Sequence, residues 1–248
     1  MDSLIIERSE EIGDVWKKRY EYLSLHFPHW ADDLPYFPYP KLWPTYTPAQ
    51  KQGMYMKWYA EALELNVWTK SEVVKAEQDD QHNWTVVINK EGQETRQLHP
   101  KHVIMATSLC GVPMTPEIPG MADFKGGAIR HSTAHDSARE FVGKKVCIVG
   151  TSSSGFDTAF DCSRRGIDVT LLQRSPTYIM SLTHSVPRTI GNYGPDAEGN
   201  RPSHEEQDRL FFATPTGPGE ELARRNAKML EDLDRPLLDA LHARGLRT

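Results

Sequence analysis

The chain has 248 residues, of which 25% are charged and 38% are hydrophobic, and its formal net charge is −5. This composition is typical of a folded globular protein rather than a disordered chain, and the acidic balance argues against nucleic-acid binding, which requires clustered cations. No apolar run reaches the roughly 20 residues that cross a bilayer, and the N-terminus carries no signal-peptide pattern, so we expect a cytoplasmic protein without a membrane span.

The N-terminal third combines a short strand with a proline-rich loop. The apolar run Leu4–Ile6 predicts a strand that is buried in a parallel sheet and ends at Glu7. A parallel strand needs a neighbour and none precedes this one, so we expect the chain to begin partway through a fold. Residues 28–48 contain six prolines among aromatic side chains, which predicts an extended loop that either lines a substrate channel or simply covers the sheet.

The next segments change from helical to strand periodicity. Apolar residues recur at helical spacing over residues 48–64, and the period then falls to two. Three segments with turn residues between them predict an antiparallel β-meander: Val73–Glu77, Trp84–Ile88 and Thr95–Leu98. The apolar run Val103–Ala106 predicts one more buried strand.

The second half of the chain predicts an α/β domain. Prolines at positions 113, 116 and 119 indicate a boundary that divides the chain into residues 1–112 and 113–248. The strand–helix–strand pattern that follows consists of Val146–Val149, Ser153–Arg165 and Val169–Leu172. Residues 187–202 are rich in loop-forming residues, and three helices are expected after them: Ser203–Phe212, Gly219–Asp232 and Arg235–Ala243.

The three cysteines do not form a redox or zinc-binding motif. Cys110, Cys147 and Cys162 include no CxxC pair, which argues against structural zinc and against thiol–disulphide exchange. Cys147 falls in the middle of a predicted strand and Cys162 in the middle of a predicted helix. We therefore expect both to be core thiols.

A glycine-containing turn joins the first strand of the predicted βαβ unit to its helix. Gly150 would allow the tight turn and Gly155 the close packing of helix on strand, while Ser152 stands where a middle glycine is usual. Such a turn aims helix N–H groups at the pyrophosphate of a dinucleotide. The alternative is a strand–turn–helix with a purely structural role.

The end of the second strand indicates which nucleotide would bind. NAD sites place an acidic residue there, whereas NADP sites place a cation near the 2′-phosphate. Here Arg174 occupies this region and no acid is present, so the sequence favours NADP, with a solvated surface arginine as the alternative. Glu7, at the end of the N-terminal strand, could hold a nucleotide ribose in the same way.

Several separated motifs, in a fixed order, resemble the flavin-containing monooxygenases, most closely their fungal and YUCCA-like branch. The matching segments are residues 5–8, 12–16, 19–20, 23–26 and 28, then 43–46, 59–60, 106–108, 118–120, 124–132, 150–155 and 173–176. The resemblance implies a two-domain, Rossmann-like flavoprotein in which NADPH reduces FAD. With O2 the reduced flavin would form a C4a-hydroperoxide that oxygenates a small organic substrate; the motifs are shared by enzymes acting on heteroatoms, ketones and 2-oxo acids.

The resemblance also implies roles for individual residues. Glu7 would hold the FAD ribose, with Gly13 and Trp16 along the flavin. His131 would belong to the segment that links the two domains. The NADPH phosphates would contact Gly150, Ser152, Ser154 and Gly155, and the 2′-phosphate would contact Arg174. No residue stands out as an acid–base catalyst.

Departures from the family pattern are as informative as the matches. The FAD-binding GxGxxG that would precede Glu7 and the C-terminal segment that completes the FAD domain are both missing, and Ser108 replaces a usual glycine. We therefore expect an incomplete FAD domain that binds FAD poorly and self-associates through an exposed sheet edge. The alternative to a monooxygenase is a non-catalytic remnant or NADP(H)-binding module.

Two other site types are disfavoured by spacing. His131 and His135 lie four residues apart without a third ligand, which argues against a metal site. Ser153 and Ser154 lack the glycine that a nucleophile elbow requires two positions earlier, which argues against a serine hydrolase.

Overall fold

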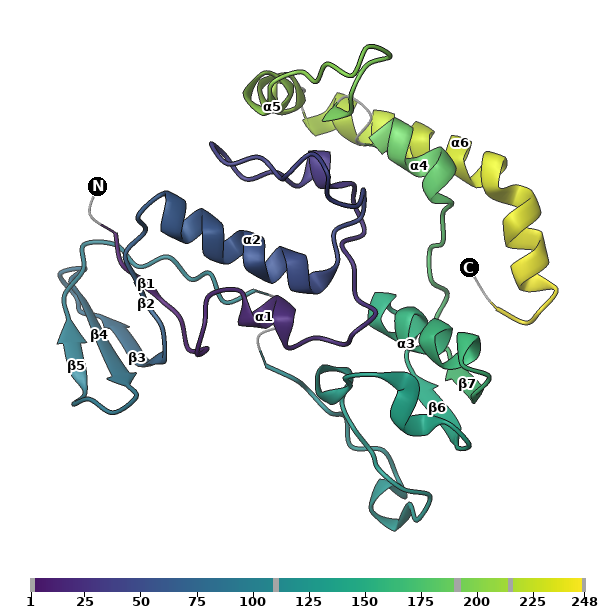
Figure 1. Ribbon diagram of the computed structural model, residues 1–248, viewed down its shortest axis with the longest axis horizontal. Coiled ribbons are helices and arrows are strands. Elements are labelled where there is room, and N and C mark those ends of the chain that lie inside the picture. Colours follow the sequence, from purple (N-terminus) through teal and green to yellow (C-terminus); the bar gives the residue numbers. More distant parts are fainter. Residues whose placement is uncertain (1–2, 109–111, 190–192, 214–215, 247–248) are drawn as a thin grey trace. The chain divides into compact units, whose positions relative to one another are not determined.

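A computed structural model describes residues 3–108, 112–189, 193–213 and 216–246. The chain divides into two compact units, each built from two stretches of sequence (Figure 1). Unit 1 consists of residues 1–23 and 48–137, and unit 2 of residues 24–47 and 138–248. The functional division at residues 112 and 113 stays a prediction.

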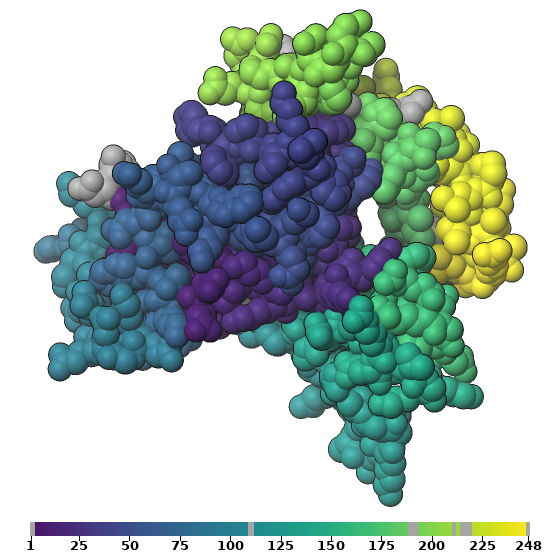
Figure 2. Space-filling view, in the orientation of Figure 1, coloured from purple at the N-terminus to yellow at the C-terminus, as the bar shows by residue number. Residues whose placement is uncertain are grey.

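Unit 1 begins with the predicted short strand. Strand β1 (Ile5–Ile6) pairs in parallel with β2 (Val67–Trp68), which confirms a parallel strand at the N-terminus. Its predicted burial is wrong, because Ile5 is 45% exposed in a sheet of two strands. Helices α1 (Asp14–Lys17) and α2 (Ala49–Ala62) follow, and α2 confirms the predicted helix. The surface of α2 is shown in blue in Figure 2.

The two helices pack closely because glycines face each other. Gly13 has a positive φ of 86°, and a Cβ built on it would lie 2.2 Å from the carbonyl oxygen of Gly53. A side chain at Gly13 is therefore excluded by its backbone conformation and by its neighbour. After Gly13, the chain buries Tyr20 and Leu23 against Ala49.

The predicted β-meander is confirmed. Strands β3 (Ser71–Gln78), β4 (Trp84–Lys90) and β5 (Arg96–Leu98) form an antiparallel sheet in the order β3-β4-β5. Ile88 on β4 is fully buried, as period-two alternation requires of one face. Two short 3-10 helices, η2 (Met121–Asp123) and η3 (Ser132–Ala134), complete the unit.

The strand predicted over Val103–Ala106 is wrong. This segment is irregular, and the side chains of Ile104 and Met105 are 88% and 67% exposed. Among the described residues, no strand lies beside it to accept its backbone hydrogen bonds, and an apolar run without a partner strand does not form a sheet.

Unit 2 contains the predicted βαβ arrangement. Strand β6 (Lys145–Val149), helix α3 (Ser153–Arg164) and strand β7 (Asp168–Leu172) form it, with β6 and β7 parallel. The 3-10 helix η4 (Ala138–Phe141) packs on α3. Cys162, which is fully buried, confirms one of the two predicted core thiols.

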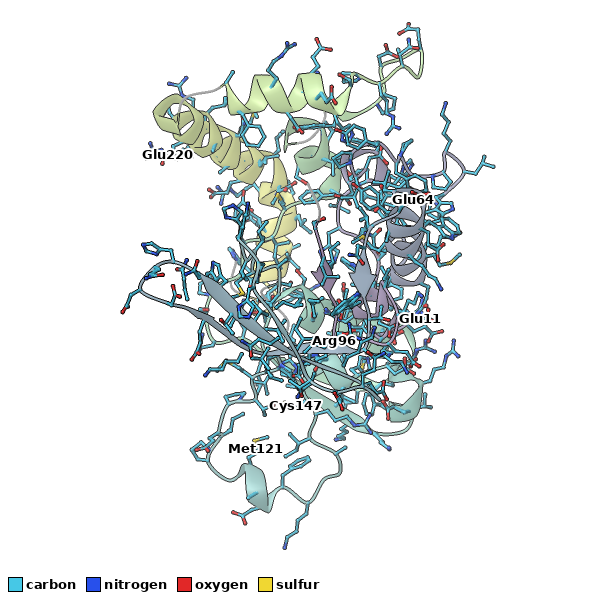
Figure 3. All side chains as sticks on the ribbon, turned by 90° about the vertical axis from the view of Figure 1, so that its left-hand side faces the viewer. Glu11, Glu64, Arg96, Met121, Cys147 and Glu220 are labelled. Atoms are coloured by element: carbon cyan, nitrogen blue, oxygen red, sulfur yellow. The ribbon has the colours of Figure 1, made fainter. Side chains whose placement is uncertain are left out.

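The other predicted core thiol is wrong. Cys147, labelled on β6 in Figure 3, is exposed, and Val149 on the same face is 65% exposed. In the described part of the chain this sheet has two strands, and the buried cluster lies on the face that packs against Cys162. Side chains that alternate along β6 therefore divide between that cluster and solvent, whereas the apolar run predicted burial on both faces.

The C-terminal helices differ from expectation in two places. Helix α4 (Leu182–Thr189) continues through Pro187, so the predicted loop does not begin there, and positions 190–192 lie outside the described residues. Helix α5 (His204–Phe212) confirms the predicted one. Helix α6 (Thr216–His242) is continuous, where two helices were predicted.

The continuity of α6 has a structural cause. Asp234, in the predicted break, accepts a hydrogen bond of 2.7 Å from the Ser181 N–H and lies 2.6 Å from Nδ1 of His184 on α4. These bonds hold α6 against α4 on the N-terminal side of Pro236. No helix in the described part of the chain is both long and apolar enough to cross a membrane.

The proline-rich loop is irregular, as predicted, apart from the 3-10 helix η1 (His29–Ala31). Asp33 holds it together, accepting a bond of 2.6 Å from the Tyr39 N–H and one of 3.3 Å from Nη1 of Arg201. Burial and the neighbouring Asp33 raise the pKa of Asp32 to about 6.

Candidate nucleotide-binding site

The turn between β6 and α3 has the geometry that its sequence predicts. Gly150 has a positive φ of 112°, and its N–H donates to the carbonyl oxygen of Leu172 over 2.9 Å. A Cβ built on Gly155 would lie 2.3 Å from the carbonyl oxygen of Gly150. Gly150 therefore provides the backbone conformation, and Gly155 allows the helix to start against the strand.

Helix α3 presents its N-terminus at this turn. Ser152 is the N-cap residue, and its carbonyl oxygen accepts from Gly155 and Phe156 over 2.9 and 3.1 Å. The first N–H groups of any helix have no partner within the helix, and the helix dipole places partial positive charge there. Ser152 is exposed and Ser154 is half-buried, so both lie where an anionic ligand could reach them.

Arg174 lies at the same edge of the sheet. It follows the carboxyl end of β7 by two residues and is exposed. The Gly150 bond to Leu172 places the turn beside the end of β7. Because the carboxyl ends of parallel strands meet at one edge of a sheet, the glycine turn and Arg174 lie at the same edge of the β6–β7 sheet.

Two residues at this edge were missed from the sequence. The hydroxyl oxygens of Thr151 and Thr177 lie 2.7 Å apart, and the Thr177 hydroxyl donates to the Thr151 carbonyl oxygen over 3.1 Å. Thr151 is buried. Its place within the glycine turn was a signal, but nothing local in the sequence indicated Thr177 as its partner.

Glu7 of unit 1 lies at the carboxyl end of β1. It is half-buried, and its Oε1 accepts a bond of 2.6 Å from the Ser9 N–H. Its backbone is fixed on both sides, because its N–H donates to Trp68 and its carbonyl oxygen accepts from Ser71. Glu7 therefore has a defined position with one carboxylate oxygen already hydrogen-bonded.

The other site residues predicted in unit 1 are Gly13, Trp16 and His131, and each makes a packing or hydrogen-bonding contact within the unit. Gly13 is the close contact of α1 with α2, and Trp16 packs against the buried cluster that contains Tyr20. His131 is the N-cap residue of η3, where its Nδ1 accepts from the Thr133 N–H over 3.2 Å. Gly13, Trp16 and Glu7 lie in one unit, and the glycine turn and Arg174 lie in the other.

Arg8, the residue after Glu7, lines an open cleft of about 280 Å³. Its lining is mostly charged: Arg8, Lys70, Glu72, Asn89, Lys90 and Glu91. Lys70 lies 3.2 Å from a carboxylate oxygen of Glu10 and 3.2 Å from one of Glu91, and these hydrogen bonds raise its pKa. Nearby, Nζ of Lys90 and Cζ of Arg96 lie 5.1 and 5.2 Å from the ring centre of Trp68. Arg96 is labelled in Figure 3.

The described residues contain neither a cluster suited to a metal ion nor a disulphide bond. No group of three or more His, Cys, Asp or Glu side chains suited to a metal ion occurs among them. Cys147 and Cys162 are both free, and burial raises the pKa of the Cys162 thiol.

Comparison with known proteins agrees with this architecture. A family model described as pyridine nucleotide-disulphide oxidoreductase matches residues 2–187. The indole-3-pyruvate monooxygenase YUCCA1 of Oryza sativa subsp. japonica is 31% identical over 178 residues, which cover 71% of this chain and 43% of that protein. The chain thus spans less than half the length of this curated relative.

Solved structures show the same fold. A flavin-containing monooxygenase from Stenotrophomonas maltophilia superposes with a TM-score of 0.62 at 23% identity, over 72% of this chain and 51% of that one. An ornithine N-hydroxylase from Kutzneria sp. 744, with reduced FAD, NADP+ and L-ornithine, has a TM-score of 0.54 at 13% identity, over 98% of this chain and 62% of that one. The relatives confirm the resemblance to flavin-containing monooxygenases, and the neighbours confirm the α/β flavoprotein fold.

Proposed function

Because the chain belongs to the pyridine nucleotide-disulphide oxidoreductase family, we propose that it functions in an FAD- and NADPH-dependent monooxygenase that oxygenates a small organic substrate with O2. The observation that carries this proposal is the edge of the β6–β7 sheet, where the glycine turn, the α3 N-terminus and Arg174 come together. When bound, the two cofactors would supply the redox chemistry and the activation of O2.

The residues of unit 2 fit NADPH. The absence of a Cβ at Gly150 leaves open space beside the turn, so backbone N–H groups can approach a pyrophosphate. The hydroxyls of Ser152 and Ser154 would add donors beside the helix N-terminus. Arg174 would bind the 2′-phosphate through its planar fork of donors and so select NADPH over NADH.

The residues of unit 1 fit FAD in part. Glu7 has one oxygen bonded to the Ser9 N–H, which orients the carboxylate and leaves its second oxygen to accept from a ribose hydroxyl. Gly13 and Trp16 would act through the packing of α1 rather than through polar contacts. We assign His131 a positioning role at η3, where its Nδ1 is used internally.

The direct test is a visible absorption spectrum of the purified chain, recorded before and after addition of FAD and then of NADPH without oxygen. FAD is added in excess, because we expect the chain to bind it weakly. The flavin absorbance should then fall when NADPH is added, faster than with NADH. Bound flavin that NADPH does not reduce would contradict the proposal.

Arg174→Ala tests the nucleotide assignment separately. Losing the charged hydrogen bonds to a 2′-phosphate should weaken NADPH binding by about tenfold or more, and NADH binding should stay unchanged. Lys145→Ala is the matched control, because Lys145 is an exposed cation at the opposite end of β6. Equal losses for NADPH and NADH in the Arg174 variant would count against the assignment.

A second candidate function is an NADP(H)-binding module without oxygenase activity. It is favoured by the contrast between the complete turn of unit 2 and the single ribose-binding candidate, Glu7, in unit 1. The spectrum distinguishes the two, because a module would bind NADPH without reducing the added FAD.

A further inference from the structure

We infer that Thr151 and Thr177 form a latch that positions Arg174 and thereby sets the preference for a 2′-phosphorylated dinucleotide. This inference rests on the proposed function, since it concerns the same nucleotide site. It assigns a positioning role to two residues, neither of which needs to touch the ligand.

The hydrogen-bond geometry of the latch is complete. The Thr177 hydroxyl has one proton, and its donation to the Thr151 carbonyl oxygen over 3.1 Å uses that proton. The contact of 2.7 Å between the two hydroxyl oxygens then has Thr151 as its donor. Two bonds therefore join the same pair of residues, and Thr151 is buried, which shields them from competing water.

The position of the latch explains what it does. The segment after β7 is held to the glycine turn at both ends, by the Gly150 bond to Leu172 and by the latch at Thr177. Arg174 lies between these two anchors in irregular backbone. Removing the Thr177 hydroxyl would leave one of these two anchors for the irregular backbone between β7 and α4, which begins at Leu182.

Holding this segment lowers the entropy lost when Arg174 binds a phosphate. A side chain whose backbone is already fixed loses less freedom on binding, so pre-organisation appears as affinity. Pyrophosphate contacts at Gly150 and the α3 N-terminus would depend less on this segment, because the Gly150 bond to Leu172 holds the turn without Thr177. The latch should consequently act on NADPH more than on NADH.

The test compares Thr177→Val, which removes the hydroxyl at nearly constant shape, with Thr177→Ser, which keeps it. Dissociation constants for NADPH and NADH are measured by titration calorimetry on the full chain. Thr177→Val removes both hydrogen bonds of the latch and should weaken NADPH binding roughly three- to tenfold, because only part of their energy appears as affinity; NADH binding should weaken less than about twofold. Thr177→Ser should restore the NADPH affinity.

Combination with Arg174→Ala shows whether the latch acts through Arg174. If it does, Thr177→Val has no further effect on NADPH binding in the Arg174→Ala background. Additive losses, or equal losses for NADPH and NADH, would overturn the latch and leave the proposed function standing. Wild-type protein that binds neither nucleotide would overturn both.

Discussion

The carbonyl oxygen of Gly150 determines which residues the chain tolerates at the start of α3. Gly155→Ala would place a methyl group 2.3 Å from that oxygen, and neither backbone segment can move without shifting β6 or α3. We expect a loss of about 1–3 kcal/mol in the free energy of unfolding, as for other overpacked sites. Urea denaturation followed by circular dichroism measures it.

Ser163→Ala is the control for this substitution, because it adds no clash on the exposed face of the same helix. Its effect should stay within about 0.5 kcal/mol. If the Gly155 variant were as stable as this control, the close approach would not exist in solution.

Asp161 makes the stability of unit 2 depend on pH. Its buried carboxylate accepts from the Ala138 N–H over 3.0 Å and from Nε of Arg164 and Arg165 over 2.9 Å each. Burial alone would raise its pKa, but these hydrogen bonds outweigh burial and lower the pKa below 3.8. The folded pKa is thus depressed, so the stabilisation is present above about pH 4 and is lost as the pH falls through the folded pKa.

Asp161→Asn should therefore cost about 1–3 kcal/mol at neutral pH, because buried donors lose their charged acceptor. The loss should shrink at low pH, where the wild-type carboxylate is itself protonated. Urea midpoints of both proteins between pH 3 and pH 7 check this. Parallel pH profiles would mean that Asp161 does not supply the acid sensitivity.

Individual site residues could be predicted from the sequence only where the structural requirement involves a few neighbouring residues. Gly150 and Gly155 could be predicted, because a tight turn between a strand and a helix restricts its own backbone. Thr177 could not, because it meets Thr151 across 26 residues and through side chains. The exposure of Cys147 was missed because an apolar strand has the same pattern whether one or both faces are covered.

At the scale of elements, Asp234 connects α4 to α6. Asp234→Asn should weaken its bonds to the Ser181 N–H and to His184, so α4 should open more often. We expect amide hydrogen exchange in residues 181–186 to accelerate about tenfold. Asp232→Asn is the control on the same helix, where exposed pairing with Arg235 contributes little. Equal acceleration in both variants would contradict the role of Asp234.

Helices and strands could be predicted where the local sequence pattern agreed with the tertiary contacts of the segment. The meander could be predicted from the period-two alternation of apolar residues, and the βαβ unit from the turn residues that separate its strands from its helix. The strand over Val103–Ala106 failed because strand formation needs a neighbour that a local pattern cannot supply. The break predicted between Asp232 and Arg235 was wrong, because the contact of Asp234 with α4 lies within a continuous helix.

At the scale of the whole molecule, the two units could not be read from local signals. Residues 24–47 belong with the C-terminal half through contacts such as that of Asp33 with Arg201, 168 residues apart. Likewise, Glu21 and Ser137 of unit 1 are joined across 116 residues. Composition and periodicity carry no information about such pairings, so the two units follow from contacts between segments that are distant in the sequence.

Self-association is the property that the exposed β1 strand should confer on the chain. In the described residues β1 pairs with β2 alone, and Ile5 is 45% exposed, so an open edge with an apolar side chain can pair with another copy. Ile5→Lys should shift the chain toward monomer in sedimentation velocity across a concentration series, because a charge blunts a strand edge. Val15→Lys, an equal charge on the exposed surface of α1, should leave association unchanged. If both variants dissociate the chain equally, net charge rather than the β1 edge governs its assembly.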